Sequence, residues 1–159
     1  MQVTKTNAMR ILDAKKIEYE VLIYDNEDGN IHGTAVAEKV GRPPEVVFKT
    51  LVSHSGPNLY VFVIPVAEEL DLKKAAKAAG EKKIEMLPVK ELQKWTGYIR
   101  GGCSPVGMKK LYPTYIDNSA AVLDKMAVSA GKIGMQMELA PSQLVGIVAA
   151  EFCELVRSL

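Results

Sequence analysis

The 159-residue sequence has few of the side chains that most often mark a metal site or a disulfide framework, with two cysteines and two histidines. Cys103 and Cys153 are too few for a disulfide scaffold in a chain of this length, so a reducing, cytoplasmic setting is the simpler expectation. These cysteines and the histidines His32 and His54 stand in four separate places and give no zinc-ligand spacing. We therefore expect neither a metal site nor a cofactor.

Long hydrophobic runs and an excess of charge are also missing. No stretch approaches the roughly 18 apolar residues of a membrane helix, so no membrane span or membrane partner is expected. The first residues lack the apolar segment of a secretory signal. The formal net charge is +1, so DNA is not an expected partner and RNA binding would need a local basic face. Neither a P-loop nor a G-x-G-x-x-G motif occurs, which argues against nucleotide hydrolases and dinucleotide enzymes.

The residues that are present have an ordinary globular composition, 48% hydrophobic and 25% charged, and the length suits one domain over residues 1–159. Helical spacing and capping residues predict helices at 7–16, 35–40, 71–79 and 88–95 and from 141 onward. Runs rich in β-formers predict strands at 18–24, 46–52, 59–65, 84–86, 111–117, 126–130 and 135–139. The irregular order of these elements predicts an α+β fold with a mixed sheet of about seven strands.

Four local features sharpen this prediction. The short link between 46–52 and 59–65 favours an antiparallel hairpin. Pro113 predicts an edge strand, because proline cannot donate to a central ladder. Thr34 is a candidate cap for the helix that begins at residue 35. The apolar stripe after Pro141 predicts a last helix that extends past Cys153.

The segment 97–110 contains four glycines within eleven residues, together with Cys103. Glycine allows positive φ and close approach of the backbone to a ligand. Taken alone, a tight structural turn is the favoured interpretation, and a loop that presents backbone N–H groups is the alternative. A nucleophilic Cys103 is a third possibility, which needs a base or a cationic setting. No Cys-His-Asn or Cys-His-Asp pattern supplies the base.

Lys49 interrupts the apolar run 46–52. Lysine is almost never fully buried without a partner. Two interpretations stay open: an edge lysine that extends into solvent, or a cation in a pocket that holds a carbonyl or phosphate oxygen.

Other lysines cluster along the sequence, and two interpretations stay open for them as well. They form solvated faces or, if they converge in the fold, a surface for an RNA backbone. They are Lys73, Lys74, Lys77, Lys82, Lys83, Lys109, Lys110 and, apart from these, Lys132.

Several segments together carry a resemblance that none carries alone. They are VFKTL (47–51), PVA (65–67), LDLKKAAK (70–77), KKIEM (82–86), TGY (96–98), GGCSPVGMKK (101–110), VSAGK (128–132) and EL (138–139). In this order, across nearly the whole chain, they resemble the YbaK/EbsC aminoacyl-tRNA deacylases, which are related to the editing insertion domain of bacterial prolyl-tRNA synthetase. The resemblance implies one α+β domain with a mixed, partly barrel-like sheet surrounded by helices.

The resemblance also implies roles for particular residues. It makes Lys49 the functional lysine and Gly101 the ester-facing backbone, and these two are the implied catalytic residues. The implied substrate-binding residues are Tyr24, Phe48, Thr50, Gly102, Cys103, Ser104, Pro105 and Gln136. The implied tRNA-binding residues are Lys73, Lys74, Lys77, Lys109, Lys110 and Lys132. Gln136 stands where some members carry an aspartate, and Ile133 replaces an arginine that many members have.

The implied function is trans-editing, the removal of a misattached amino acid from tRNA. For this branch the usual substrate is proline tRNA carrying cysteine, sometimes also cysteine tRNA, and the substrate's own thiol is thought to attack its ester. Such a reaction needs positioning and oxyanion stabilisation rather than a catalytic triad. Prolyl-tRNA synthetase is an expected further partner. The alternatives are a deacylase for another small amino acid such as alanine and a non-catalytic module that binds tRNA or a synthetase.

Overall fold

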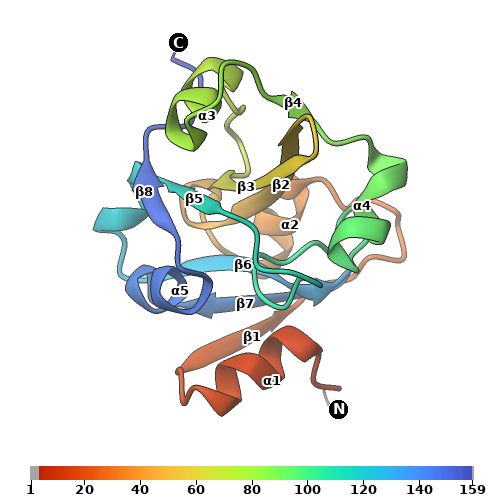
Figure 1. Cartoon of the computed structure of the whole chain (residues 1–159). Coiled ribbons are helices and arrows are strands. Elements are labelled where there is room, and N and C mark those ends of the chain that lie inside the picture. The colour runs from red at the N-terminus through yellow and green to blue at the C-terminus, as the bar shows by residue number, and fades with distance from the viewer. Residues whose placement is uncertain (1–3, 159) are drawn as a thin grey trace.

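The computed structural model describes residues 4–158, and in this range the chain forms five α-helices and eight strands in two sheets (Figure 1). The smaller sheet is antiparallel and has the order β1 (Tyr19–Ile23), β7 (Met135–Leu139), β6 (Met126–Lys132). The larger sheet has the order β4 (Glu85–Met86), β2 (Phe48–Ser55), β3 (Asn58–Pro65), β5 (Thr114–Asp117), β8 (Glu151–Cys153). Strand β5 runs parallel to both of its neighbours. The predicted α+β class and mixed sheet are confirmed, with eight strands in two sheets and no closed barrel over the described range.

The β2–β3 hairpin is the predicted one, and its register explains its unbroken apolar sequence. Val61 and Val63 belong to the main core, which lies between the two sheets. Phe62 and Ile64 point to the other face of the larger sheet and pack against Ala75 of α3 (Leu72–Ala79). Because both faces of β3 are covered, the strand needs apolar residues at consecutive positions.

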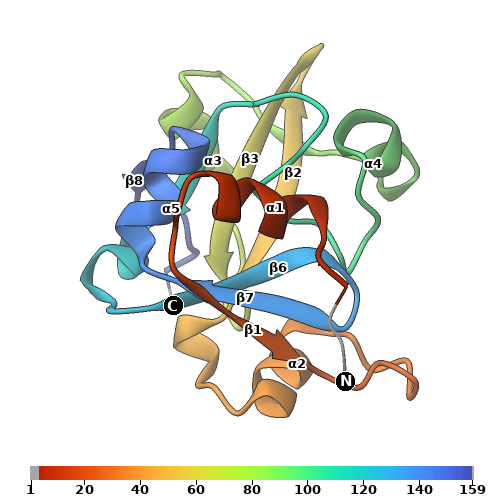
Figure 2. The same cartoon turned by 90° about the horizontal axis from the view of Figure 1, so that it is seen from below.

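The remaining helices cover the smaller sheet and close the core. Helix α1 (Asn7–Ala14) packs against β6, and α2 (Gly33–Val40) lies on the opposite side of the same sheet (Figure 2). Helix α4 (Val89–Thr96) follows β4, and α5 (Pro141–Val148) follows β7. None of the described helices combines the length and apolar character needed to cross a membrane.

Side-chain caps occur at the first turns of α1 and α3 but not at the first turn of α2. Thr6 caps α1 and Asp71 caps α3, each accepting from a backbone N–H of the first turn. Thr34 lies inside α2, whose first turn has no side-chain cap, so its predicted capping role is wrong.

Two element predictions are also wrong, for related reasons. Strand β5 is not an edge strand, because it lies between β3 and β8. Pro113 precedes the strand, and its carbonyl accepts from the Val61 N–H at 2.9 Å, so its missing donor costs the ladder nothing. The last helix ends at Val148, after which Ala149 adopts a left-handed conformation with φ of 53°. Phe152 and Cys153 then pair with β5 as strand β8 instead of continuing the helix.

The two sheets meet at one point beside the start of β2. Val47 and Ala127 form a parallel bridge there, and both are fully buried. The β2 residues that follow Val47 therefore leave the junction with one side facing β6 and β7. A cavity opens at this junction.

Candidate active site

The cavity has a volume of about 680 Å³, within the range of small-molecule sites. Its wall draws on β2, the ends of β1, β6 and β7, the start of α2, and the glycine-rich loop that follows α4. Its lining residues are Tyr24, Ile31, His32, Gly33, Thr34, Val36, Val47, Phe48, Lys49, Thr50, Leu51, Val66, Arg100, Gly101, Cys103, Ser129 and Gln136. The structure thus brings together most of the residues that the resemblance assigns to the site.

Lys49 is the cation of this cavity whose surroundings are most unusual. It lies on β2 opposite Ile64 and is half-buried. Burial lowers the pKa of the Lys49 ammonium from its ordinary value of 10.5, and the charges of Glu69 and Glu68 oppose part of that shift. Within residues 4–158 its ammonium makes no ion pair or hydrogen bond. A partly desolvated cation without a protein partner is well suited to hold a ligand oxygen.

Gly101 forms the loop side of the cavity, and two observations explain why a glycine stands there. Its φ is +89°, a conformation that other residues rarely adopt. A Cβ at this position would lie 2.9 Å from the Ile31 Cδ1 atom. The N–H of Gly102 donates to the Ile99 carbonyl at 3.0 Å, whereas the Gly101 N–H has no acceptor within residues 4–158. The Gly101 amide is therefore available to a ligand.

Tyr98 fixes this loop to the rest of the fold. Its hydroxyl donates to the Val106 carbonyl at 2.5 Å. A Cβ on Gly107 would lie 2.8 Å from that hydroxyl, and a Cβ on Gly131 would lie 2.9 Å from the ring. These two glycines therefore make room for the tyrosine, which ties the loop to β6 and holds Gly101 in place.

Cys103 lies in the wall but is poorly suited to act as a nucleophile. Its side chain is buried, and burial raises the pKa of the thiol to about 12 against a smaller, opposite effect of the Thr96 hydroxyl. The thiolate is the reactive form of cysteine. At neutral pH the thiol stays protonated, so its contribution to the cavity is shape.

Two buried polar atoms in the wall have no hydrogen-bond partner among the described residues. They are Thr50 Oγ1 and Gln136 Oε1. Gln136 lies in β7 between Leu22 of β1 and Ser129 of β6, and its side chain is 6% exposed. An unpaired buried acceptor costs about 1–3 kcal/mol. Both atoms would gain a partner from a ligand that brings N–H or S–H donors into the cavity.

Three of the residues implied by the resemblance lie outside the lining. Gly102 packs its backbone against Ile133, where a Cβ would lie 3.1 Å from the Ile133 nitrogen. Ser104 is fully buried, and its Oγ accepts from the Val106 N–H at 3.2 Å. Pro105 lines a second, smaller cavity of about 240 Å³. These three residues therefore support the loop from behind and do not line the cavity.

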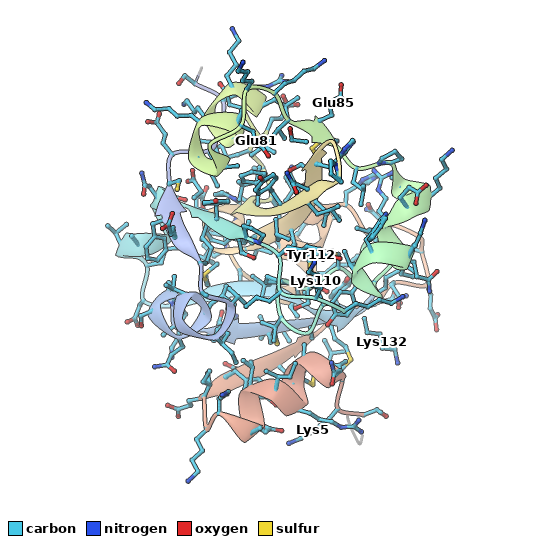
Figure 3. The ribbon with its side chains drawn as sticks, in the orientation of Figure 1. Lys5, Glu81, Glu85, Lys110, Tyr112 and Lys132 are labelled. Carbon is cyan, nitrogen blue, oxygen red and sulfur yellow. The ribbon has the colours of Figure 1, made fainter. Side chains whose placement is uncertain are left out.

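The lysines do not form one continuous face. Helix α3, with Lys73, Lys74 and Lys77, covers the far face of the larger sheet, whereas Lys110 and Lys132 lie on the other side (Figure 3). The Lys74 ammonium is held by Glu154 and by the Val156 carbonyl, each at 2.8 Å. The basic sets therefore separate into two groups.

Sequence reasoning missed several lining residues: Ile31, His32, Thr34, Arg100 and Ser129. Arg100 could have been found, because it directly precedes Gly101. The start of α2 gave no signal, because only the tertiary fold places it opposite the glycine-rich loop. No group of three metal-ligating side chains occurs in the described part of the chain.

The fold and the cavity together define a class: a small α+β domain with a ligand site built on a desolvated lysine, an unused backbone amide and two unpaired acceptors. This arrangement can bind a reactive carbonyl compound and stabilise negative charge on its oxygen.

Comparison with known proteins narrows the class to a family. Residues 32–147 match the family model of the aminoacyl-tRNA editing domain. The chain is 47% identical over 154 residues to a curated protein of Enterococcus faecalis (strain ATCC 700802 / V583) named "Putative Cys-tRNA(Pro)/Cys-tRNA(Cys) deacylase EbsC", covering 95% of this chain and 93% of that protein. The chain belongs to the aminoacyl-tRNA editing domain family, and the resemblance found in the sequence is confirmed.

Solved structures share the fold at low sequence identity. One is described as "Crystal structure of a putative trans-editing enzyme for prolyl tRNA synthetase"; it is 20% identical with a TM-score of 0.82, covering 98% of this chain and all of that one. Another comes from work on epitope backbone grafting onto scaffold proteins and is 22% identical with a TM-score of 0.85, with 98% and 100% coverage. At these identities the likeness establishes the fold alone.

Proposed function

We propose that this protein is a trans-editing aminoacyl-tRNA deacylase that removes cysteine from Cys-tRNA(Pro), and also from Cys-tRNA(Cys). The observation that carries the proposal is Lys49, a half-buried cation in a cavity of about 680 Å³ that forms no ion pair or hydrogen bond with residues 4–158. That volume can take an aminoacyl group together with part of the terminal nucleoside. The 47% identity to a protein named as a deacylase of these two substrates supports the choice.

In this proposal Lys49 and Gly101 act on the ester carbonyl. The Lys49 ammonium and the free Gly101 N–H stabilise the negative charge that develops on the carbonyl oxygen. Thr50 Oγ1 and Gln136 Oε1 accept from the α-ammonium or the thiol of the substrate, which satisfies two acceptors that are otherwise unpaired. An amide oxygen is enough for that task, so the site does not need the aspartate that some relatives carry at position 136.

In this proposal the substrate supplies the nucleophile, because the buried Cys103 thiol of the cavity wall stays protonated at neutral pH. The sulfur of the substrate cysteine attacks its own carbonyl carbon, the ester C–O bond breaks, and a cyclic thioester leaves the tRNA. The thiol proton ends on the departing ribose hydroxyl. Water then opens the thioester and releases cysteine. The protein supplies orientation and charge stabilisation.

The partners follow from the same proposal. The tRNA contacts Lys109, Lys110 and Lys132 with its phosphates near the cavity. Lys73 and Lys77 lie beyond the larger sheet and would reach a more distant part of the tRNA or a partner protein. Prolyl-tRNA synthetase, which produces the mischarged tRNA, is the proposed second partner, and the cytoplasm is the proposed compartment.

Deacylation assays on matched substrates test the proposal. We expect the protein to release cysteine from Cys-tRNA(Pro) and to act far more slowly on Ala-tRNA(Pro), which lacks the thiol. Lys49→Ala should abolish the activity. Equal rates on both substrates would contradict thiol assistance and favour a deacylase of broader specificity. Binding of the charged tRNA without faster ester loss would instead favour a non-catalytic tRNA-binding module.

A further inference from the structure

The C-terminal end of α4 carries an exposed aromatic ring among cations. Trp95, the only tryptophan of the chain, is 40% exposed, and Ile99, four residues further along the chain, is 50% exposed. The Lys94 ammonium lies 5.0 Å from the centre of the Trp95 ring. Lys109 and Lys110 are also exposed. We call the set Lys94, Trp95, Ile99, Lys109 and Lys110 the α4 platform.

Hydrogen bonds to backbone carbonyls of α4 hold this platform together. The Lys109 N–H donates to the Thr96 carbonyl at 3.1 Å, and the Lys109 ammonium donates to the Lys94 carbonyl at 3.2 Å. The Tyr112 hydroxyl donates to the Trp95 carbonyl at 2.7 Å. Segment 109–112 is therefore fixed against the last turn of α4, and Figure 3 labels Lys110 and Tyr112 in this region.

The platform is positively charged. Glu91, whose carboxylate is 4.0 Å from the Lys94 ammonium, is the one acidic side chain paired with these lysines in the region 4–158. An exposed ring with one ammonium over it and two further lysines close by in the fold is a poor site for an apolar protein segment. It matches a single-stranded nucleic acid, whose bases stack on aromatic rings while its phosphates meet lysines.

The platform also lies close to the cavity. Trp95 precedes Arg100, a lining residue, by five positions. Five residues span at most about 18 Å even when fully extended. A strand of a few nucleotides can therefore reach from the Trp95 ring to the cavity that holds the proposed ester.

We infer that the α4 platform docks the single-stranded 3′ end of the tRNA. This inference rests on the proposed function, and it identifies where the nucleotides that precede the aminoacyl ester lie. A base stacks on Trp95 and Ile99, and the Lys94, Lys109 and Lys110 ammonium groups meet the adjoining phosphates. A paired duplex cannot present a base face to the ring, so the platform selects unpaired nucleotides.

Tryptophan fluorescence tests the inference directly, because Trp95 is the only fluorophore of its kind in the chain. The probes are two uncharged RNA minihelices of the same stem, one with a single-stranded 3′ CCA end and one without these three nucleotides. We expect quenching by the first minihelix and clearly weaker binding of the second. Equal affinity for both minihelices would overturn the inference.

Matched variants separate stacking from folding. By fluorescence anisotropy of labelled RNA, Trp95→Leu should weaken binding of the CCA minihelix about tenfold, as expected for loss of one stacked base. Trp95→Phe, which keeps an aromatic ring, should stay within about threefold of the parent. Val122→Ala removes an exposed apolar side chain (88% exposed) from the segment between β5 and β6 and should bind like the parent. Parent-like binding by Trp95→Leu would refute the docking site, and circular dichroism confirms that each variant is folded.

Kinetics distinguish failure of this inference from failure of the proposed function. If both hold, Trp95→Leu raises KM for Cys-tRNA(Pro) with little change in kcat, because the ring lies away from the reacting ester. Trp95-dependent RNA binding by a protein without deacylase activity would support the docking site and contradict the proposed function. An unchanged KM in Trp95→Leu, with the parent protein fully active on Cys-tRNA(Pro), would contradict the docking site and support the proposed function.

Discussion

At the scale of single residues, Lys49 combines an expected role in the reaction with a cost in stability. Its folded-state pKa is lowered by burial, so the folded protein binds this proton less tightly than the unfolded chain does. The free energy of unfolding should therefore rise with pH as the pH passes from the folded-state pKa to the ordinary value of 10.5. At neutral pH the buried charge costs stability, which is consistent with a role in binding a ligand.

Lys49→Met tests whether the buried charge lowers stability and whether it is needed for activity. We expect deacylation to fall about 10²–10³-fold, as when an oxyanion-stabilising group is removed, while the melting temperature stays equal or rises. In the parent protein the enzymatic rate, corrected for spontaneous ester loss, should decline with increasing pH before the pKa of an ordinary lysine is reached. A variant that is both active and less stable would show that Lys49 has a structural role instead.

Gly101 should not tolerate a side chain. Gly101→Ala places a Cβ 2.9 Å from Ile31 Cδ1 at a φ of +89°, so the loop must move away from the cavity. Gly29→Ala is a matched control, since Gly29 also has positive φ (+73°) but no atom within 4 Å of its Cβ. Both variants should lose some stability from backbone strain. We expect only Gly101→Ala to lose most of its kcat, and equal losses in both would count against a specific role for this amide.

Cys103 should be dispensable for the reaction. Because burial raises the pKa of its thiol to about 12, the thiolate is scarce at neutral pH. Cys103→Ala should keep deacylation of Cys-tRNA(Pro) within a fewfold of the parent, apart from a packing effect on the cavity. Alkylation of Cys103 by iodoacetamide should be slow at pH 7 and detected by mass spectrometry only after long exposure. Loss of activity in Cys103→Ser, with unchanged folding, would restore the thiol as a nucleophile.

At the scale of elements, the Arg42 side chain ties the end of α2 to the smaller sheet. Arg42 follows α2, and its Nε and Nη2 atoms donate to the Glu138 carboxylate of β7 at 2.7 and 3.3 Å. The Glu138 side chain is only 12% exposed. Two-point pairing with a nearly buried carboxylate is stronger than an ordinary surface pair, so this contact helps to fix the α2 wall of the cavity against β7.

Arg42→Met should therefore lower the melting temperature by several degrees, because it leaves the Glu138 charge buried without its partner. Arg157→Met is the control: it breaks a pair with Glu69 at 2.8 Å in which both side chains are more than 60% exposed. Pairs of that kind contribute little, so the control should melt within about 1–2 °C of the parent. Differential scanning calorimetry compares the two, and equal shifts would show that burial of Glu138 is unimportant.

At the scale of the whole molecule, a net charge of +1 means that tRNA affinity has to come from a few local cations. For an RNA single strand that meets only Lys94, Lys109 and Lys110, the slope of log Kobs against log salt concentration should be about −2. Replacing Lys109 and Lys110 by alanine should reduce this slope to about −1. A slope that changes only when Lys73 and Lys77 are replaced would place the RNA across α3 instead, and fluorescence anisotropy at several salt concentrations measures it.

Sequence and tertiary structure determined different parts of this protein. Local patterns were enough for the β2–β3 hairpin and for the α+β class, because both depend mainly on residues close together in the chain. They failed at β5 and at the end of α5, where pairing between distant strands outweighed the presence of Pro113 and the helical spacing of Phe152.

The candidate site divides in the same way. The sequence by itself singled out Lys49 and the glycine-rich loop, since a lysine in an apolar strand and four close glycines are local anomalies, and the family resemblance gave them a role. Only the tertiary structure shows that Ile31 and Arg100 line the same cavity and that Gln136 Oε1 has no partner among the described residues. It also shows that Pro105 lines the second cavity instead of this one. The physical reason is that burial, desolvation and clearance around a glycine are properties of packing between segments far apart in the chain.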